Sequence, residues 1–425
     1  MKKEALSTES YKGVRDFYPE DMAIQRYIFD TWSKTAESFG FERYDASVLE
    51  PSDLYKSKGA ENEEMVNEQT YTFIDRGERE VTLRPEMTPT VARMVAGKRR
   101  ELAFPLRWYS IPNLFRYERP QRGRLREHWQ LNCDIFGSHS TMADVEIILL
   151  ASEILKGFGA KASDFEIRVN SRALWNAYCE QWKITDEQRQ SLSGLVDRKN
   201  KISLEEFNTA AKTILPDDSV YTAFLSVIHQ TGTTPEMPEY HTLQKTIATL
   251  KELGISSVSY DPSIMRGFNY YTGIVFEVFD TDPANRRALL GGGRYDNLTE
   301  LFGGDPIPAV GFGFGDVTIR DFIETHDLMP PHLQSIDIAL IPMKQEYALE
   351  AEKMAQYMRA AGKKVYVSLA DKKVGDHIKQ AEARHTKAII VIGEEEIASN
   401  TFTLKRLQDG FETKGTIKEL LASDD

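Results

Sequence analysis

The residues best suited to chemistry lie between positions 114 and 137, in the segment LFRYERPQRGRLREHWQLNCDIFG. Its first half is crowded with arginines: Arg116, Arg119, Arg122, Arg124 and Arg126. The forked guanidinium group of arginine matches the oxygens of a phosphate, so this crowding indicates a phosphate-binding site. We expect two strands joined by an arginine-rich loop. Arg116 and Glu118 should share one face of the first strand, because side chains alternate along a strand.

The second half of this segment alternates between polar and apolar residues. Gln130, Asn132 and Asp134 would share one face of a strand, while Leu131 and Cys133 would point to the other face. A polar face of this kind is costly to bury unless it meets water or a ligand. The solvated face of an antiparallel hairpin would explain the alternation, but the arginines beside it favour a ligand.

The segment resembles motif 2 of the class II aminoacyl-tRNA synthetases, most closely that of the histidyl-tRNA synthetases. Four further segments resemble this family in its own order: KGVRDFYPED at 12–21, YTFIDRGEREVTLRPEMTPTVAR at 71–93, MRGFNYYTGIVFEVF at 265–279 and GGGRYDNL at 291–298. The resemblance therefore covers nearly the whole chain. It implies an enzyme that forms histidyl-adenylate from L-histidine and ATP and then transfers the histidyl group to the 3′ end of tRNA(His).

The resemblance also assigns ATP-binding residues. In this family ATP lies bent on an antiparallel sheet, held by arginines and Mg²⁺. Arg116 would contact the α-phosphate and Glu118 the adenine amino group, while His128 stands where an aromatic residue stacks on adenine. Arg266, in RGFNYYTG, would be a second cation at the α-phosphate, and Arg124 completes the set. Arg116 and Arg266 would be catalytic, because the histidine carboxylate attacks there and charge builds up on the phosphate oxygens.

Histidine itself is expected in a separate pocket. By resemblance, the residues that bind it are Glu86, Thr88, Gln130, Asp134, Tyr270, Tyr271 and Tyr295. Glu86, Thr88 and Gln130 map to the ammonium group. Asp134 and Tyr271 map to the imidazole ring, and Tyr295 would be either a further wall or simply a packing residue. A site built to hydrogen-bond the ring would reject analogues that leave its buried groups unpaired.

Two residues of the arginine-rich loop, Arg119 and Gln121, map to positions that contact the acceptor end of the tRNA. The net charge of −12 does not exclude a nucleic-acid partner, because phosphate contacts require only local basic surface. Members of the family are homodimers, so we expect a homodimer, although Ser47 stands where the dimer-forming motif 1 has its proline.

Motif 3 departs from the family pattern. It usually ends in a Gly-hydrophobic-Glu-Arg run whose arginine meets the γ-phosphate, but PAVGFGFGDVTIRDF places Thr318 at that position. Arg320, two residues further on, would point elsewhere from a helix. Either another cation, such as Arg122 or Arg124, serves the γ-phosphate, or the use of ATP is impaired.

This departure makes a second class of protein worth weighing, the non-catalytic, histidine-sensing paralogue that regulates ATP phosphoribosyltransferase. Such paralogues typically lack the anticodon domain and tend to lose the arginines of motif 2 and of the histidine signature. The present chain keeps Arg116, Arg119 and Arg266 and continues into a C-terminal α/β segment, which favours the synthetase. A helical scaffold or an RNA-binding module would not need the pocket pattern of Glu86 and Asp134.

The resemblance implies an α+β catalytic core on an antiparallel sheet, the class II synthetase fold, at residues 1–171 and 254–328. The apolar spacing predicts that this core begins with a helix at 18–39. Residues 172–253 are polar with helical spacing and predict a helical insertion domain. After a linker at 329–335, the alternation of strands and helices predicts a C-terminal α/β domain at 336–425 with a largely parallel sheet, which in this family binds the anticodon.

Composition adds looser bounds. A chain of 425 residues has room for more than one domain, and it contains no GxxxxGK[ST] phosphate loop. Cys133 and Cys179 lack metal-ligand spacing, so we assign no metal-binding residues and no disulfide, and a reducing compartment is expected. The sequence has no apolar run that could span a bilayer and no apolar signal-peptide core near its start, which predicts a cytoplasmic protein without a membrane partner.

Overall fold

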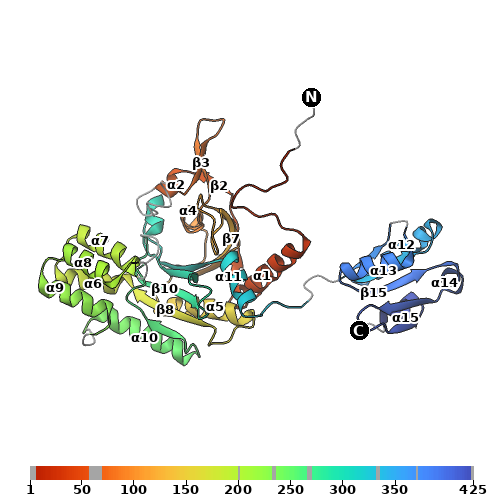
Figure 1. Ribbon diagram of the computed structural model, residues 1–425. Coiled ribbons are helices and arrows are strands. Elements are labelled where there is room, and N and C mark those ends of the chain that lie inside the picture. Colours follow the sequence, from red (N-terminus) through yellow and green to blue (C-terminus); the bar gives the residue numbers. More distant parts are fainter. Residues whose placement is uncertain are drawn as a thin grey trace. The chain divides into compact units, whose positions relative to one another are not determined.

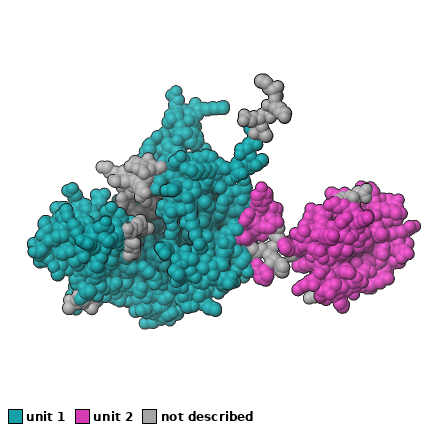
Figure 2. All heavy atoms as spheres, in the orientation of Figure 1, with its two compact units in different colours: residues 1–17, 25–329 teal, residues 18–24, 330–425 magenta. Residues whose placement is uncertain are grey.

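The computed structural model describes residues 6–56, 69–199, 202–231, 236–265, 270–331, 336–369 and 372–422. The chain divides into two compact units, which Figure 2 colours separately. The first unit comprises residues 1–17 and 25–329, and the second comprises residues 18–24 and 330–425. The two units are described separately below.

A large sheet forms the centre of the first unit (Figure 1). Within the described residues it has nine strands: β1 (Glu42–Arg43), β5 (Leu106–Ser110), β6 (Asn113–Phe115), β7 (Glu127–Phe136), β8 (Phe165–Ser171), β9 (Val258–Tyr260), β10 (Ile274–Asp280), β11 (Ala288–Arg294) and β12 (Ala309–Gly315). Their order is β1-β5-β7-β12-β11-β10-β8-β9, and β6 pairs with β7. The pairings are antiparallel except at the two edges, where β1 runs parallel to β5 and β9 to β8.

Helices cover one face of this sheet. They are α1 (Pro19–Ser38), α5 (Thr141–Gly157) and α11 (Asp316–Thr325). Trp32 of α1 is fully buried against Phe314 of β12, and α5 and α11 pack on β7 and β12. Leu131 and Cys133 of β7 are fully buried, as the alternation predicts, so Gln130 and Asp134 point to the opposite face.

Smaller elements close the ends of the core. A three-stranded sheet joins β2 (Leu49–Pro51), β4 (Glu80–Leu83) and β3 (Tyr71–Ile74), all of them antiparallel. It is followed by α4 (Thr88–Lys98), with α2 (Asp53–Lys56) and the 3-10 helix η2 (Leu298–Phe302) packed on α4. A buried aspartate, Asp316, anchors the start of α11, because its carboxylate accepts hydrogen bonds from Arg15, Gln25 and the backbone N–H of Trp129.

The segment 172–253 is helical, as its spacing predicts. Its helices are α6 (Arg172–Trp182), α7 (Asp186–Asp197), α8 (Leu204–Ile214), α9 (Asp218–Ile228) and α10 (Pro238–Glu252). Reciprocal side-chain and backbone hydrogen bonds cap α7 through Thr185 and α8 through Ser203, which stabilises both helix starts. Trp175, Phe207 and Phe224 lie at the centre of a cluster of buried apolar residues that is separate from the sheet.

The second unit contains a five-stranded sheet in the order β14-β13-β15-β16-β17 within the described residues. Its strands are β13 (Ile336–Pro342), β14 (Val365–Val367), β15 (Thr386–Ile392), β16 (Phe402–Arg406) and β17 (Glu412–Gly415). The helices are α12 (Ala348–Ala360), α13 (Val374–Ala383), α14 (Glu394–Ser399) and α15 (Ile417–Ala422). The parallel trio β14-β13-β15 is as predicted, but sequence reasoning missed the antiparallel strands β16 and β17, whose short polar segments carry little apolar alternation.

One local expectation was wrong. β6 ends at Phe115, so Arg116 and Glu118 lie in the connection to β7 rather than on a strand. The run Gly291–Gly293 lies within β11, where a side chain at Gly292 would collide with the backbone of Gly311 on the neighbouring strand. No helix among the described residues has both the length and the apolar character needed to cross a membrane.

Candidate active site

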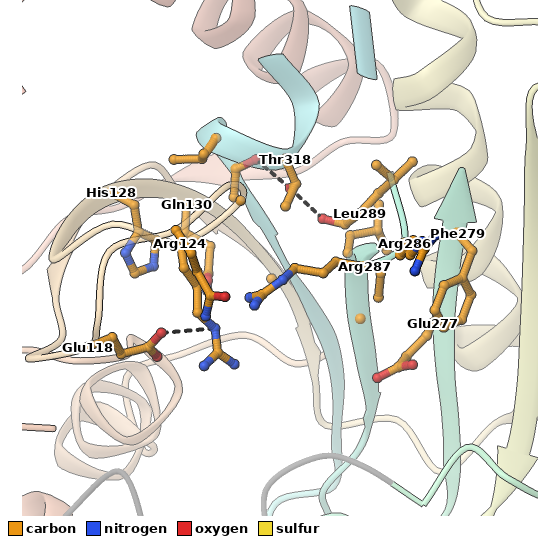
Figure 3. A pocket seen from close by; sticks show the side chains of 18 of the residues that line it. Glu118, Arg124, His128, Gln130, Glu277, Phe279, Arg286, Arg287, Leu289 and Thr318 are labelled. Carbon is orange, nitrogen blue, oxygen red and sulfur yellow. Dashed lines mark hydrogen bonds and ion pairs between the residues drawn. The ribbon is translucent and has the colours of Figure 1, made fainter. Parts of the chain in front are cut away.

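The open face of the large sheet is hollowed into a cavity of about 800 Å³ (Figure 3). Its walls come from the connection between β6 and β7, from the strands β7, β8 and β10–β12, from the start of α11 and from the end of α7. The sequence-predicted residues that line it are Arg116, Glu118, Gln121, Arg124, His128 and Gln130. The expected ATP-binding residues of motif 2 are therefore gathered around one space.

A second cavity of about 180 Å³ adjoins the first. All of the residues expected to bind histidine line it: Glu86, Thr88, Gln130, Asp134, Tyr270, Tyr271 and Tyr295. Arg116, Gln130, Gly291 and Gly313 line both cavities, so the two spaces share a wall. Segments more than 180 positions apart in the sequence, such as Glu86 and Tyr270, meet here through a hydrogen bond.

Glycines on β12 make room for the polar side chains of β7. Gly311 pairs with Asp134 in the antiparallel register, and a side chain at Gly311 would overlap the Asp134 carboxylate. A side chain at Gly313 would likewise overlap the amide group of Gln130. The alternation on β7 and the glycine spacing on β12 therefore create the small cavity together.

Asp134 is buried at the floor of the small cavity, and its two carboxylate oxygens differ. The Tyr295 hydroxyl donates to Oδ1 at 2.5 Å, whereas Oδ2 has no hydrogen-bond partner among the described residues. Burial raises the pKa of Asp134 to about 7, although the hydrogen bond from Tyr295 opposes that rise. A buried acceptor without a donor is costly, so this oxygen is well suited to a ligand N–H group. Tyr295 both packs and hydrogen-bonds.

Glu86 forms the second buried acidic group of the small cavity. Its Oε2 accepts a hydrogen bond of 3.1 Å from Tyr270, and its Oε1 has no hydrogen-bond partner among the described residues. Burial raises the pKa of Glu86 to about 8, against the opposing effects of Arg116 and Tyr270. A cationic ligand placed here would favour the carboxylate form and satisfy the open oxygen.

The large cavity carries a cationic wall. Arg116 donates to the backbone oxygen of Pro85 at 2.8 Å, which fixes its side chain between the two cavities. Arg124 forms an ion pair of 2.9 Å with Glu118 (Figure 3). Desolvation, together with Arg116, Arg15 and Arg124, lowers the pKa of His128 to about 3. The imidazole is therefore neutral at pH 7 and could stack on a neutral ring.

The motif 2 arginines do not all reach the cavity. Arg126 packs its guanidinium on the Tyr117 ring and donates to the backbone of Lys12, so it holds the N-terminal segment. Arg119 is exposed and does not line either cavity. The second expected catalytic arginine, Arg266, lies outside the described residues.

Thr318 occupies the position where an arginine was expected. Its hydroxyl donates to the backbone oxygens of Leu289 and Gly315, at 2.7 and 3.0 Å, and it lines the large cavity without contributing charge. Arg320 lies against Glu324 and away from both cavities, as expected. Of the two proposed substitutes, Arg124 lines the large cavity, whereas Arg122 bonds to Asn285 and lies 3.8 Å from Asp321.

Sequence reasoning missed several residues that line the large cavity: Arg168, Asp197, Glu277, Phe279, Arg286 and Arg287. Glu277 and Phe279 lie on β10 with the same parity, within a segment that the family resemblance had already singled out, so strand alternation could have identified them. Arg286 and Arg287 end the loop 281–287, where the only signal was a pair of arginines before a strand. Asp197 comes from the helical segment, which had shown no link to the site.

Comparison with known proteins supports one family throughout. A family model described as histidyl-tRNA synthetase matches residues 13–316, and one described as an anticodon-binding domain matches residues 337–423. The chain is 43% identical over 415 residues to a histidine–tRNA ligase of Leptospira biflexa, covering 95% of this chain and 94% of that one. It is 40% identical over 430 residues to the Thermoplasma volcanium histidine–tRNA ligase, covering 98% of both.

Solved structures show the same fold. The crystal structure of histidyl-tRNA synthetase from Nostoc sp. PCC 7120 matches with a TM-score of 0.83 at 22% identity and covers 99% of both chains. A Bacillus halodurans structure titled as an ATP phosphoribosyltransferase regulatory subunit/histidyl-tRNA synthetase matches with a TM-score of 0.75, covering 91% of this chain and 99% of that one. Fold alone thus does not separate the two classes of protein, whereas the full-length identity to ligases and the matched anticodon-binding domain do.

Proposed function

The chain belongs to the histidyl-tRNA synthetase family of class II enzymes and is a histidine–tRNA ligase, and we propose that its two joined cavities divide the first half-reaction between them. The small cavity binds histidine and the large cavity binds ATP. One observation carries this division: Arg116 lines both cavities at their common wall. The reacting carboxylate and the α-phosphate would meet at that wall.

The first step forms histidyl-adenylate. A carboxylate oxygen of histidine attacks the α-phosphorus of ATP, the bond from that phosphorus to the bridging oxygen breaks, and pyrophosphate leaves. Two anions must approach each other, which Coulomb repulsion resists. Arg116 opposes that repulsion and stabilises the charge that builds on the α-phosphate oxygens. Arg266 remains the proposed second cation at this point.

Histidine is held by the two buried acidic groups. Its ammonium group would bind the open oxygen of Glu86, with Thr88 and Gln130 beside it. One N–H of its imidazole ring would fill the open oxygen of Asp134, and Tyr271 and Tyr295 would border the ring. This arrangement is supported by the unpartnered buried oxygens of Glu86 and Asp134, which lie in the same small cavity.

The ATP side is arranged around Glu118, Arg124 and His128. We propose that Glu118 accepts a hydrogen bond from the adenine amino group and that neutral His128 stacks on the base. Arg124 pairs with Glu118 and thereby orients it. A neutral imidazole is the better stacking surface for an uncharged base because it brings no charge that burial would penalise.

The residues present fit Mg²⁺ that arrives with ATP. Among the residues that the structure describes, no group of three or more acidic, histidine or cysteine side chains is gathered around a metal site. Glu118 and Glu277 line the large cavity on different sides. Because Mg²⁺ in nucleotide sites is usually held by one or two carboxylates plus the substrate phosphates, this is sufficient. When bound, Mg²⁺ would neutralise part of the phosphate charge.

In the second step, the terminal ribose hydroxyl of tRNA(His) attacks the adenylate carbonyl and AMP leaves. We propose that Arg119 and Gln121, in the connection between β6 and β7, contact the acceptor end. Arg119 is exposed and Gln121 lines the mouth of the ATP cavity, which supports this role. The anticodon would be bound by the domain at 336–425, and 172–253 would be a helical insertion into the core at 1–171 and 254–328.

We further propose a homodimer. The small sheet β2-β4-β3 exposes Leu49 and Phe73 on one face, at 45% and 47%, and Ile74 on the other face, at 63%. Exposed apolar side chains that share a face can form an interaction surface. A mass measurement in solution would give twice the chain mass, and a charged residue at Phe73 would reduce it to one chain. The cytoplasm is the proposed compartment.

The test of the proposed function is histidine-dependent exchange of labelled pyrophosphate into ATP, followed by charging of tRNA(His). A histidine-sensing regulatory protein would bind histidine but would support neither reaction. Truncation after Leu328 separates the two halves of the proposal. Exchange should persist, since the first unit has its own core. Charging should fall by at least about tenfold, the effect of losing about 1.4 kcal/mol of tRNA-binding free energy. Full charging by the truncated protein would contradict the anticodon role.

A further inference from the structure

The large cavity lacks the expected positive charge at the end that Thr318 lines. ATP carries most of its negative charge on the β- and γ-phosphates, and pyrophosphate leaves with that charge. Arg116 lies at the wall shared with the histidine cavity and so serves the α-phosphate. Thr318 is neutral and turns its hydroxyl to backbone oxygens. A different cation must lie near the terminal phosphates, because a transferring phosphoryl group needs positive charge around its oxygens.

Arg287 stands in the right place. It is the last residue of the loop 281–287, immediately before β11, and it lines the large cavity. Its Cδ lies 3.3 Å from the point where a Cβ of Gly123 would be, and the Thr318 methyl group lies 3.9 Å from the same point. Arg287 and Thr318 therefore approach the same residue of the motif 2 loop. Figure 3 shows the Arg287 side chain extended into the cavity toward Arg124.

The loop that carries Arg287 is held in place by hydrogen bonds. Asp280 accepts from the side chain of Asn285 at 2.7 Å and from the backbone of Asp282 at 2.8 Å. Asn285 also donates to Thr325 of α11 at 3.1 Å. Since its loop is tied to α11, Arg287 can be presented to a ligand at little cost in conformational entropy.

The other arginines near the large cavity are held by contacts in different parts of the site. Arg122 donates to Asn285 Oδ1 at 3.1 Å and approaches Asp321, so it ties the motif 2 loop to the loop 281–287. Arg124 is paired with Glu118 on the side proposed for adenine. Arg286 lines the cavity next to Phe279, and Figure 3 draws it turned away from the centre that Arg287 enters.

We propose that Arg287 binds the β- and γ-phosphates of ATP and the departing pyrophosphate, so that the positive charge missing at position 318 is supplied from the facing loop. This inference rests on the proposed ATP site and adds to it the residue that recognises the triphosphate end. A guanidinium can bind two phosphate oxygens at once. It would stabilise the leaving group as the bond to the α-phosphorus breaks.

The test compares two ligands on one variant. ATP contains the terminal phosphates, whereas histidyl-sulfamoyl-adenosine, a stable mimic of the adenylate, lacks them. In Arg287→Ala, the affinity for ATP measured by calorimetry should fall about 10- to 100-fold, as expected for lost hydrogen bonds to charged groups. The affinity for the mimic should change by less than about twofold. Arg320→Gln is the matched control, because Arg320 pairs with Glu324 outside both cavities and both affinities should be retained.

Equal losses for ATP and the mimic would show that Arg287 only supports the fold of the site, and unchanged ATP affinity would show that it does not bind phosphate. Either result overturns the inference. Absence of pyrophosphate exchange in the wild-type protein would instead overturn the proposed function, and the ligand comparison is independent of that result because it requires no turnover.

A double variant tests directly whether a cation at position 287 and a cation at position 318 serve the same phosphates. In Arg287→Ala combined with Thr318→Arg, the cation returns to the position used by the family pattern, next to the same Gly123. The affinity for ATP should recover by at least about fivefold relative to Arg287→Ala alone, a part of the expected loss. No recovery, with the affinity for the mimic preserved, would overturn the claim that the two positions serve the same phosphates.

Discussion

The histidine cavity and the ATP cavity are built in opposite ways. The floor of the small cavity is formed by β7, β11 and β12, whose register is set by the sheet, and its polar groups include the buried acids Glu86 and Asp134 and three tyrosines. Most charged side chains of the large cavity lie on loops, and most of them are arginines. The histidine cavity can recognise its ligand because buried carboxylate oxygens of Glu86 and Asp134 can each accept a hydrogen bond from it. The ATP cavity attracts its ligand by positive charge.

This difference predicts how each cavity should respond to substitution. A buried, strand-borne acceptor has no substitute nearby, so its removal should affect one ligand strongly and selectively. The ATP cavity has several arginines on loops, so one arginine can supply the charge that is missing at another position. We propose this for Arg287, which would replace the arginine absent at position 318. Arg116 lies on the shared wall and should be the exception, because it belongs to both cavities.

The largest effect is expected at Arg116. Arg116→Ala removes the cation at the junction, and adenylate formation should slow by about 10²- to 10³-fold, as when one transition-state donor is removed. Rapid-quench measurement of the first turnover tests this directly. Arg119→Ala is the control from the same loop, since Arg119 lines neither cavity. Its adenylate formation should match the wild type, while tRNA charging should fall. A normal first-turnover rate in Arg116→Ala would refute the shared-wall mechanism.

The next effect concerns selectivity of the small cavity. Asp134→Ala removes the acceptor proposed for the imidazole N–H, and hydrogen bonds to charged groups contribute about 1.5–3 kcal/mol, so kcat/KM for histidine should fall about 10- to 200-fold. The KM for ATP should be nearly unchanged. An analogue without the ring N–H should be activated poorly by the wild type and lose little further in the variant. Equal losses for histidine and the analogue would mean that Asp134 only supports the sheet.

The same contrast explains what could be predicted from the sequence. Every residue expected in the histidine cavity lines it. Strand alternation accounts for Gln130 and Asp134 on β7, whereas Glu86, Thr88 and the three tyrosines lie outside the strands and were expected only from the family resemblance. The antiparallel core was predicted from the family resemblance, and the C-terminal α/β unit was predicted from its alternation of strand and helix patterns. Loop residues such as Arg287 were not, since its position depends on side-chain bonds of Asp280 and Asn285 that no periodic pattern encodes.

The glycines of β12 show a further limit. Their spacing is visible in GFGFG, but its meaning depends on the register that sets Gly311 opposite Asp134. The strands β16 and β17 were missed because both are short and β17, at the edge of the sheet, carries no apolar side chain. The fifth arginine of the loop, Arg126, was read as part of a phosphate site but packs on Tyr117.

The smallest predicted effect is a pH dependence that only the histidine cavity should show. Burial raises the pKa of Glu86 to about 8, so at pH 7 roughly one site in ten carries the carboxylate. The histidine ammonium favours that carboxylate and lowers its pKa on binding. Binding at pH 7 should therefore release about 0.9 proton from Glu86, and histidine affinity should weaken about fivefold between pH 8 and pH 7.

Calorimetry at pH 7 in buffers of different ionisation enthalpy measures that proton release. Asp134, whose pKa burial raises to about 7, and the ring of free histidine also titrate in this range, so the comparison must be made against Glu86→Gln. The variant keeps both of those groups but has no carboxylate at position 86. Its proton release should be smaller than that of the wild type by about 0.9. Proton release on ATP binding should be the same in the two proteins, because Glu86 lines only the histidine cavity. Equal proton release by the wild type and Glu86→Gln would place the ammonium site elsewhere and remove the main distinction between the two cavities.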